Sequence, residues 1–104
     1  ETVAALFTLP KGTKIYSPVN GQLTSTNAQD AEKVTYHTVK DANGIIYVLV
    51  FEPESVPQSR QVKAGDIIGI TTGKKYTLLQ NNSLAVSTIK DQRFGKAQFV
   101  ALFR

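Results

Sequence analysis

Apolar and polar residues alternate along several short segments of the chain, and a period of two is typical of a half-buried β-strand. Residues 34–39, "VTYHTV", alternate in this way, and residues 45–51, "IIYVLVF", form an apolar run rich in β-branched and aromatic residues. Between them, residues 41–44 contain an Asn-Gly pair, which is a strong signal for a tight turn. Residues 34–52 therefore predict a β-hairpin.

Turn residues divide the rest of the chain into further short strands. Residues 13–26 predict a strand, a break at Pro18, a turn at Asn20-Gly21 and a second strand. A turn at Ala64-Gly65-Asp66 leads into "IIGITTG", and "PESVPQSRQ" before it reads as a polar loop. The phrases "KGTKIYSPVNGQL" and "VKAGDIIGI" each set a glycine-containing turn beside a short apolar strand, which predicts hairpins that fold back across each other.

The last third of the chain predicts the strands "YTLLQ", "LAVSTIK" and "AQFVALF", joined by turns at Asn81-Asn82 and from Asp91 to Gly95. No window of eleven or more residues keeps a helical spacing, and "AQDAEK" predicts at most one helical turn. We therefore expect an all-β fold, a mostly antiparallel barrel or sandwich.

Length and composition fit one folded domain, residues 1–104, with 41% apolar and 19% charged residues. The chain begins with Glu rather than Met, so we expect it to be part of a longer or processed chain. It has no cysteine, which excludes disulfides and thiolate metal sites. The net charge of +4 is dispersed, so we expect solvated surface and no nucleic-acid partner. No apolar run approaches the ~18 residues that span a membrane.

Few side chains suggest chemistry by themselves. His37, the single histidine, is either a pH-sensitive group or ligand, or a surface histidine at a hairpin edge with no special role; strand alternation places it opposite to Tyr36. Glu52 is either a carboxylate that recognises a basic or amide group, or an ordinary charge at a strand end. Lys74 and Lys75 read as surface lysines, because "TTGKKYT" lacks the first glycine of a phosphate-binding loop. The chain also lacks the G-x-S-x-G elbow of a serine hydrolase.

Four phrases, taken in order, resemble the LytM/lysostaphin-type zinc peptidase domain. They are "LPKGTKIYSPVNGQL", "GIIYVLVFE", "VKAGDIIGITTG" and "NNSLAVSTIKD", and they cover most of the chain. The resemblance implies a mostly antiparallel LytM-type barrel or sandwich with a groove along one face. In active members of that family the groove holds one zinc ion, bound by the His and Asp of an H-x-x-x-D motif and by the second His of an H-x-H motif.

The residues of this chain at those positions are not zinc ligands. The resemblance places the H-x-x-x-D pair on Thr2 and Leu6, the middle-strand histidine on Glu52, and the H-x-H pair on Ser83 and Ala85. Residues 1–29 contain neither His nor Asp, so a shifted alignment supplies no ligand. Catalytic zinc takes about three protein ligands from His, Cys, Asp and Glu. We therefore expect no cofactor and no peptidase activity.

A scaffold of this kind without its metal leaves the groove for binding. The resemblance implies a noncatalytic LytM-like regulatory domain, exported to the periplasm or cell envelope, that docks an envelope protein, such as a cell-wall hydrolase, or peptidoglycan. The candidate contact residues are Thr2, Leu6, Glu52, Ser83 and Ala85. The alternative is a structural β module of a secretion, envelope or phage assembly that is held through its strand edges. An active zinc peptidase is the hypothesis that the residues favour least.

Overall fold

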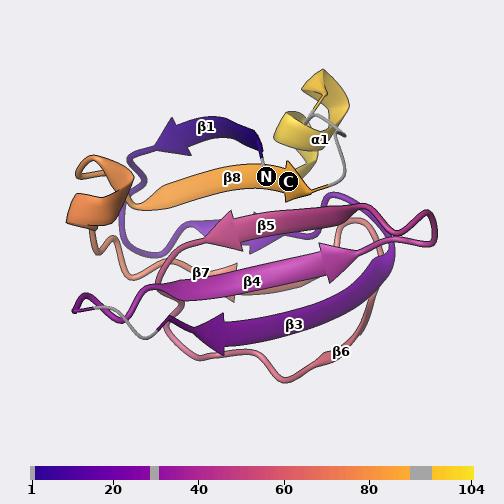
Figure 1. Ribbon diagram of the computed structural model, residues 1–104, viewed down its shortest axis with the longest axis horizontal. Coiled ribbons are helices and arrows are strands. Elements are labelled where there is room, and N and C mark those ends of the chain that lie inside the picture. Colours follow the sequence, from indigo (N-terminus) through magenta and orange to yellow (C-terminus); the bar gives the residue numbers. More distant parts are fainter. Residues whose placement is uncertain (1, 29–30, 90–94) are drawn as a thin grey trace.

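A computed structural model of the chain describes residues 2–28, 31–89 and 95–104, with side chains from residue 5 onwards. Short strands separated by turns dominate it, as the sequence predicts (Figure 1). The elements are β1 (Thr2–Phe7), β2 (Lys14–Tyr16), β3 (Gly21–Asn27), β4 (Thr35–Lys40), β5 (Ile46–Val50), β6 (Arg60–Val62), β7 (Ile67–Ile70), the 3-10 helix η1 (Thr77–Leu79), β8 (Leu84–Ile89) and the helix α1 (Lys96–Ala101).

Six strands form one antiparallel sheet in the order β1-β8-β5-β4-β3-β6, and β2 pairs with β7 in a second, two-stranded sheet. The small sheet lies behind the large one in the view of Figure 1, so the strands make two layers. Over the described residues the large sheet is open, with β1 and β6 at its edges, and does not close into a barrel. The expected all-β class is confirmed, and the layered form replaces the barrel.

The predicted hairpin forms between β4 and β5, with Asp41 organising its turn. Its Oδ1 accepts hydrogen bonds from the backbone N–H groups of Asn43 (2.9 Å) and Ile45 (3.0 Å). Gly44 takes φ +79°, a left-handed conformation that glycine adopts without a steric penalty. The Asn-Gly signal in the sequence therefore identified the turn correctly.

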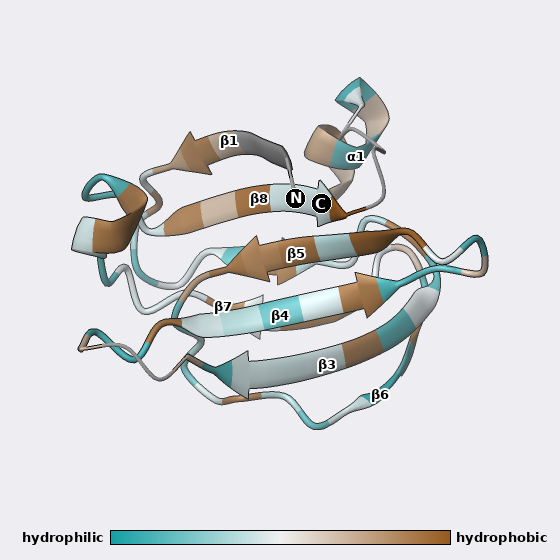
Figure 2. Ribbon diagram, in the orientation of Figure 1, coloured by the Kyte–Doolittle hydropathy of each residue, from teal (hydrophilic) through white to brown (hydrophobic). Residues whose placement is uncertain are grey.

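The central strand β5 carries apolar side chains on both faces of the sheet. Tyr47 and Leu49 point into the main core between the two layers, whereas Val48 and Val50 belong to a second cluster on the outward face. Figure 2 shows this apolar character along β5 and the neighbouring β8. The main core is completed by buried side chains from both layers and from the C-terminal segment: Ile15, Leu23, Val39, Phe51, Val62, Ile68, Leu84, Val86 and Leu102.

The segments "KGTKIYSPVNGQL" and "VKAGDIIGI" contact each other, as predicted. The strands β2 and β7 are paired, and the turns beside them exchange hydrogen bonds. The Ser17 N–H donates to the carbonyl of Asp66 (2.8 Å), the Gly65 N–H donates to the carbonyl of Ser17 (2.9 Å), and the Ala64 N–H donates to Asn20 Oδ1 (2.7 Å). The "VKAGDIIGI" phrase therefore ends in β7, one of the two strands of the second layer.

Two predicted strands are wrong. Within "YTLLQ", residues 77–79 form η1, because Glu32 accepts hydrogen bonds from the N–H groups of Thr77 (2.9 Å) and Leu78 (3.0 Å) and Gln80 turns left-handed. Within "AQFVALF", residues 97–101 belong to α1, which begins at Lys96, directly after Gly95. The turn expected from Asp91 to Gly95 lies largely outside the described residues.

Candidate functional site

The register of four neighbouring strands brings two of the predicted contact residues together. Leu6 on β1 lies opposite Ala85 on β8, Ala85 lies opposite Val50 on β5, and Val50 lies opposite Tyr36 on β4. Directly opposed residues in an antiparallel sheet point to the same face and contact each other. These four residues are called the apolar row below. It crosses the outward face of the sheet.

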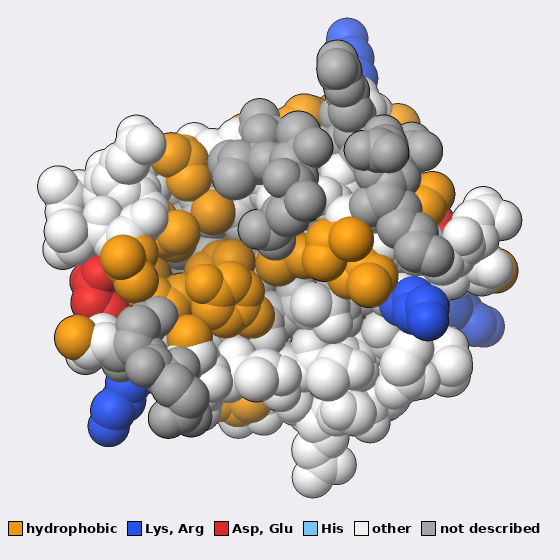
Figure 3. Space-filling model, viewed as in Figure 1, with side chains coloured by type: hydrophobic (Ala, Val, Ile, Leu, Met, Phe, Trp, Pro, Cys, Tyr) orange, Lys and Arg blue, Asp and Glu red, His pale blue; other side chains and the backbone are white. Residues whose placement is uncertain are grey.

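Other apolar side chains of the chain cover the middle of the apolar row. Ala85 and Val50 are buried, together with Val34, Val48 and Tyr76 of the outward cluster. The two ends are more accessible, since Leu6 is half-buried and Tyr36 is 38% exposed. Figure 3 shows apolar side chains gathered across the middle of this face. The accessible part of the row is therefore its two ends.

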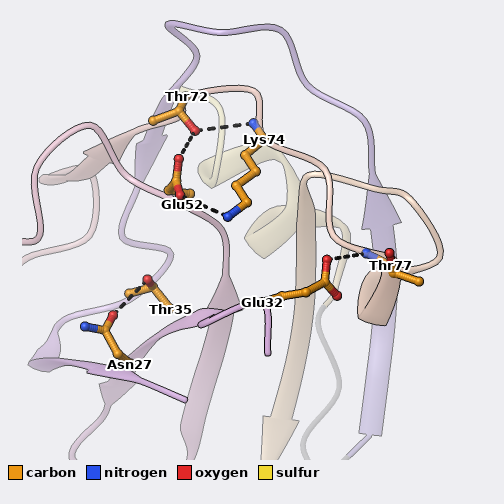
Figure 4. A network of polar contacts seen from close by, with 7 residues as sticks. All are labelled: Asn27, Glu32, Thr35, Glu52, Thr72, Lys74 and Thr77. Carbon is orange, nitrogen blue, oxygen red and sulfur yellow. Dashed lines mark hydrogen bonds and ion pairs between the residues drawn. The ribbon is translucent and has the colours of Figure 1, made fainter. Parts of the chain in front are cut away.

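Glu52 lies just beyond the end of β5 and is bound within the chain. Its Oε1 accepts a hydrogen bond from Thr72 Oγ1 (2.7 Å), and its Oε2 lies 3.6 Å from Lys74 Nζ (Figure 4). Lys74 Nζ in turn stands 5.1 Å from the centre of the Tyr76 ring. The predicted groove carboxylate is thus half-exposed, paired, and linked through Lys74 to the outward apolar cluster.

Ser83 is buried and serves the backbone beside β1. Its Oγ accepts a hydrogen bond from the Leu9 N–H (2.7 Å), and its own N–H donates to the carbonyl of Phe7 (2.9 Å). Thr2 pairs with Thr88, three residues further along β8 than Ala85, a separation of roughly 10 Å. The fold therefore brings Leu6 to Ala85 and keeps Thr2 apart from them.

These positions do not fit a zinc ion. Leu6 and Ala85 have hydrocarbon side chains without a donor atom, and the Ser83 hydroxyl holds the Leu9 backbone. Across the described parts of the chain, no three His, Cys, Asp or Glu side chains gather in one place. The apolar row is suited to contact with another apolar surface rather than to coordination.

His37 is buried completely, so the expectation of a surface histidine is wrong. Its Nε2 lies 3.1 Å from the carbonyl oxygen of Phe51, which only accepts, so Nε2 carries the proton. Nδ1 then accepts from Ser25 Oγ at 2.8 Å. Burial lowers the pKa of His37 to about 4, although the Phe51 carbonyl opposes this shift. The neighbouring Tyr36 faces the other side, as the alternation predicted.

Comparisons of the chain with protein-family models, with curated proteins and with solved structures give no match. The resemblance to LytM-type peptidases thus rests on the four sequence phrases alone. Neither described helix, η1 nor α1, is long and apolar enough to cross a membrane.

Proposed function

We propose that this chain is a noncatalytic LytM-like binding domain of the bacterial cell envelope, and that its apolar row contacts a protein partner. The proposal combines the four phrases that resemble LytM-type peptidases with the residues that occupy the ligand positions of that family. It concerns docking and assigns no reaction to the chain.

The observation that carries the proposal is the pairing of Leu6 with Ala85 inside an apolar row. The resemblance aligns these two residues with two zinc ligands, and here they are adjacent hydrocarbons continued by Val50 and Tyr36. A docking partner gains most free energy where aromatic and aliphatic side chains leave water together. Tyr36 supplies an accessible aromatic group at one end of the row, and Leu6 an aliphatic group at the other.

The same features favour a protein over peptidoglycan as the partner. Glycan strands present hydroxyl and amide groups, which need polar partners, whereas the row offers hydrocarbon and one phenol ring. The carboxylate that would bind an amide or a cation, Glu52, is already paired with Lys74 and Thr72. An apolar side chain of a protein is the better complement.

The test is capture of partners from a cell-envelope extract, compared between the native chain and the variants Tyr36→Ser and Leu6→Ala. Ile67→Ser is the matched control, because Ile67 is also a large apolar residue at 42% exposure but lies on the small sheet. A partner identified by mass spectrometry is then titrated as purified protein. We expect Tyr36→Ser to weaken its binding about tenfold and Ile67→Ser to leave it unchanged.

Three results would overturn the proposal. The first is equal binding by Tyr36→Ser, Leu6→Ala and the control, which would favour attachment through strand edges, as in a structural module. The second is sedimentation with purified peptidoglycan that both row variants abolish. The third is hydrolysis of peptidoglycan by the native chain in the presence of zinc.

A further inference from the structure

A second accessible apolar surface lies between the edge strand β1 and helix α1. Phe7 of β1 contacts Phe99 and Phe103 edge to face, with ring centres 6.2 and 5.3 Å apart. These rings, with Ala5 and Val100, line an open hollow of about 570 Å³. Val100 and Phe103 are each 39% exposed and lie together on this surface. This surface is called the phenylalanine hollow below.

The strand beside this hollow is the edge of the large sheet. Among the described strands, β1 pairs with β8, and it is the first strand in the sheet order. An edge strand directs part of its backbone N–H and C=O groups outward, where an extended segment of another chain can pair with them. Ala5 and Phe7 contribute both to this strand and to the hollow. Backbone pairing and an apolar pocket therefore occur side by side.

Charge indicates which segment fits. A second hollow of about 520 Å³ meets the first at Val100, and Lys96 and Arg104 line it. Residues 95–104 include no Asp or Glu, so the sequence supplies this segment with cations alone. A second copy of the chain would present the same cations and no carboxylate from residues 95–104, so it lacks charge complementarity to this surface. An acidic segment has the complementary charge.

We propose that the edge of β1 and the phenylalanine hollow bind an extended acidic segment of another protein. The segment adds a strand next to β1, places an apolar side chain in the hollow, and sets carboxylates near Lys96 and Arg104. This site lies on the main-core side of β1, from which Ala5 and Phe7 pack on that core, whereas Leu6 belongs to the outward cluster. It is thus a different surface from the apolar row.

The probe is a short fluorescent peptide that alternates valine with glutamate, and its counterpart carries lysine in place of glutamate. Binding to the chain is measured by fluorescence anisotropy. We expect the acidic peptide to bind at least about tenfold more tightly than the basic one, and to weaken as salt is added. In isotope-labelled protein, the amide signals of β1 should shift on titration.

The variant Val100→Ser tests the hollow, because it removes apolar surface without adding a charge. Val56→Ser is its control, since Val56 is an exposed valine (54%) in the loop between β5 and β6. We expect Val100→Ser to weaken binding of the acidic peptide about tenfold and Val56→Ser to have little effect. Lys96→Glu, compared with Lys75→Glu, tests the charge without changing the apolar surface, and both lysines are exposed.

The proposal is overturned if the acidic peptide does not bind, if both peptides bind equally, or if each variant matches its control. Sedimentation showing a dimer that Val100→Ser dissociates would assign the surface to a second copy of the chain, and would also overturn the proposal. The apolar-row variant Tyr36→Ser should leave peptide binding unchanged, so this proposal and the proposed function can fail independently.

Discussion

The enclosed histidine shows how a single residue can make stability depend on pH. His37 is held neutral, because its Nε2–H donates to the Phe51 carbonyl and its Nδ1 accepts from Ser25. Adding a proton would put a second N–H where the imidazole now accepts, and would place a charge in a buried site. The folded protein therefore resists protonation, whereas the unfolded chain does not.

This difference predicts a loss of stability in mild acid. The folded pKa of about 4 lies below the ordinary 6.5, so the unfolded state binds the proton first. The stability that the protein gains from neutral His37 is fully present above pH 6.5. It is lost as the pH falls from 6.5 towards 4. We expect the free energy of unfolding, measured by urea titration, to be about 2 kcal/mol lower at pH 5 than at pH 7.5. The variant His37→Gln should be less stable at pH 7.5, but its free energy of unfolding should change less with pH. If both proteins lose stability equally between pH 7.5 and pH 5, this account of His37 is contradicted.

Position 21 requires glycine because of close packing rather than because of its backbone conformation. A methyl group there would lie 2.8 Å from the carbonyl carbon of Lys40 and 2.9 Å from Val39 Cγ1. We expect Gly21→Ala to lower the free energy of unfolding by about 2–3 kcal/mol. Gly12→Ala, which meets no atom within 4 Å but changes a residue at φ +88°, should cost about 1 kcal/mol. Denaturant titration measures the free energy of unfolding of both variants. Equal losses would mean that β4, which carries Val39 and Lys40, moves to accommodate the added methyl group.

At the scale of elements, strands were predictable wherever alternation and a turn signal agreed. Residues 34–52 satisfy both conditions, and the hairpin forms there. The segment "AQFVALF" has the apolar content of a strand, but its Ala97, Gln98 and Ala101 favour a helix, and Phe99 packs against Phe7. In a short apolar segment, the spacing of hydrophobic residues alone does not distinguish a strand from a helix. Contacts with distant parts of the chain determine which of the two forms.

The 3-10 helix η1 depends on a residue far away in the sequence. Glu32 accepts from the N–H groups of Thr77 and Leu78, some 45 residues further along the chain. We expect Glu32→Ala to destabilise the protein by about 1–2 kcal/mol and to speed hydrogen exchange at those two amides. Glu54→Ala, at an exposed glutamate, is the control. Unchanged exchange at Thr77 and Leu78 would show that η1 holds without Glu32.

At the scale of the whole molecule, the resemblance carried by the four phrases groups Leu6 with Ala85, and the strand register pairs these two residues across β1 and β8. The resemblance also groups Thr2 with them, but Thr2 pairs further along β8. The extension of the row to Tyr36 and the enclosure of His37 depend on strand order, which a one-dimensional pattern does not contain.

The hydrocarbon character of Leu6 and Ala85 leads to a prediction about metals. A ligand that binds only the folded state stabilises it by an amount that grows with the logarithm of the ligand concentration divided by Kd, and so raises the unfolding temperature. We expect the midpoint of thermal unfolding to be the same with equimolar zinc as with a chelator. The double variant Leu6→Asp/Ala85→His introduces donor atoms at two positions and serves as the comparison. A zinc-dependent rise for the native chain would contradict the assignment of these positions.

The strand at the centre of the large sheet has a consequence for how this sequence can diverge. Because β5 supplies Tyr47 and Leu49 to one cluster and Val48 and Val50 to the other, it has no face on which polar substitutions are harmless. A polar substitution at any of residues 47–50 should therefore destabilise the fold, whichever side of the sheet its side chain occupies.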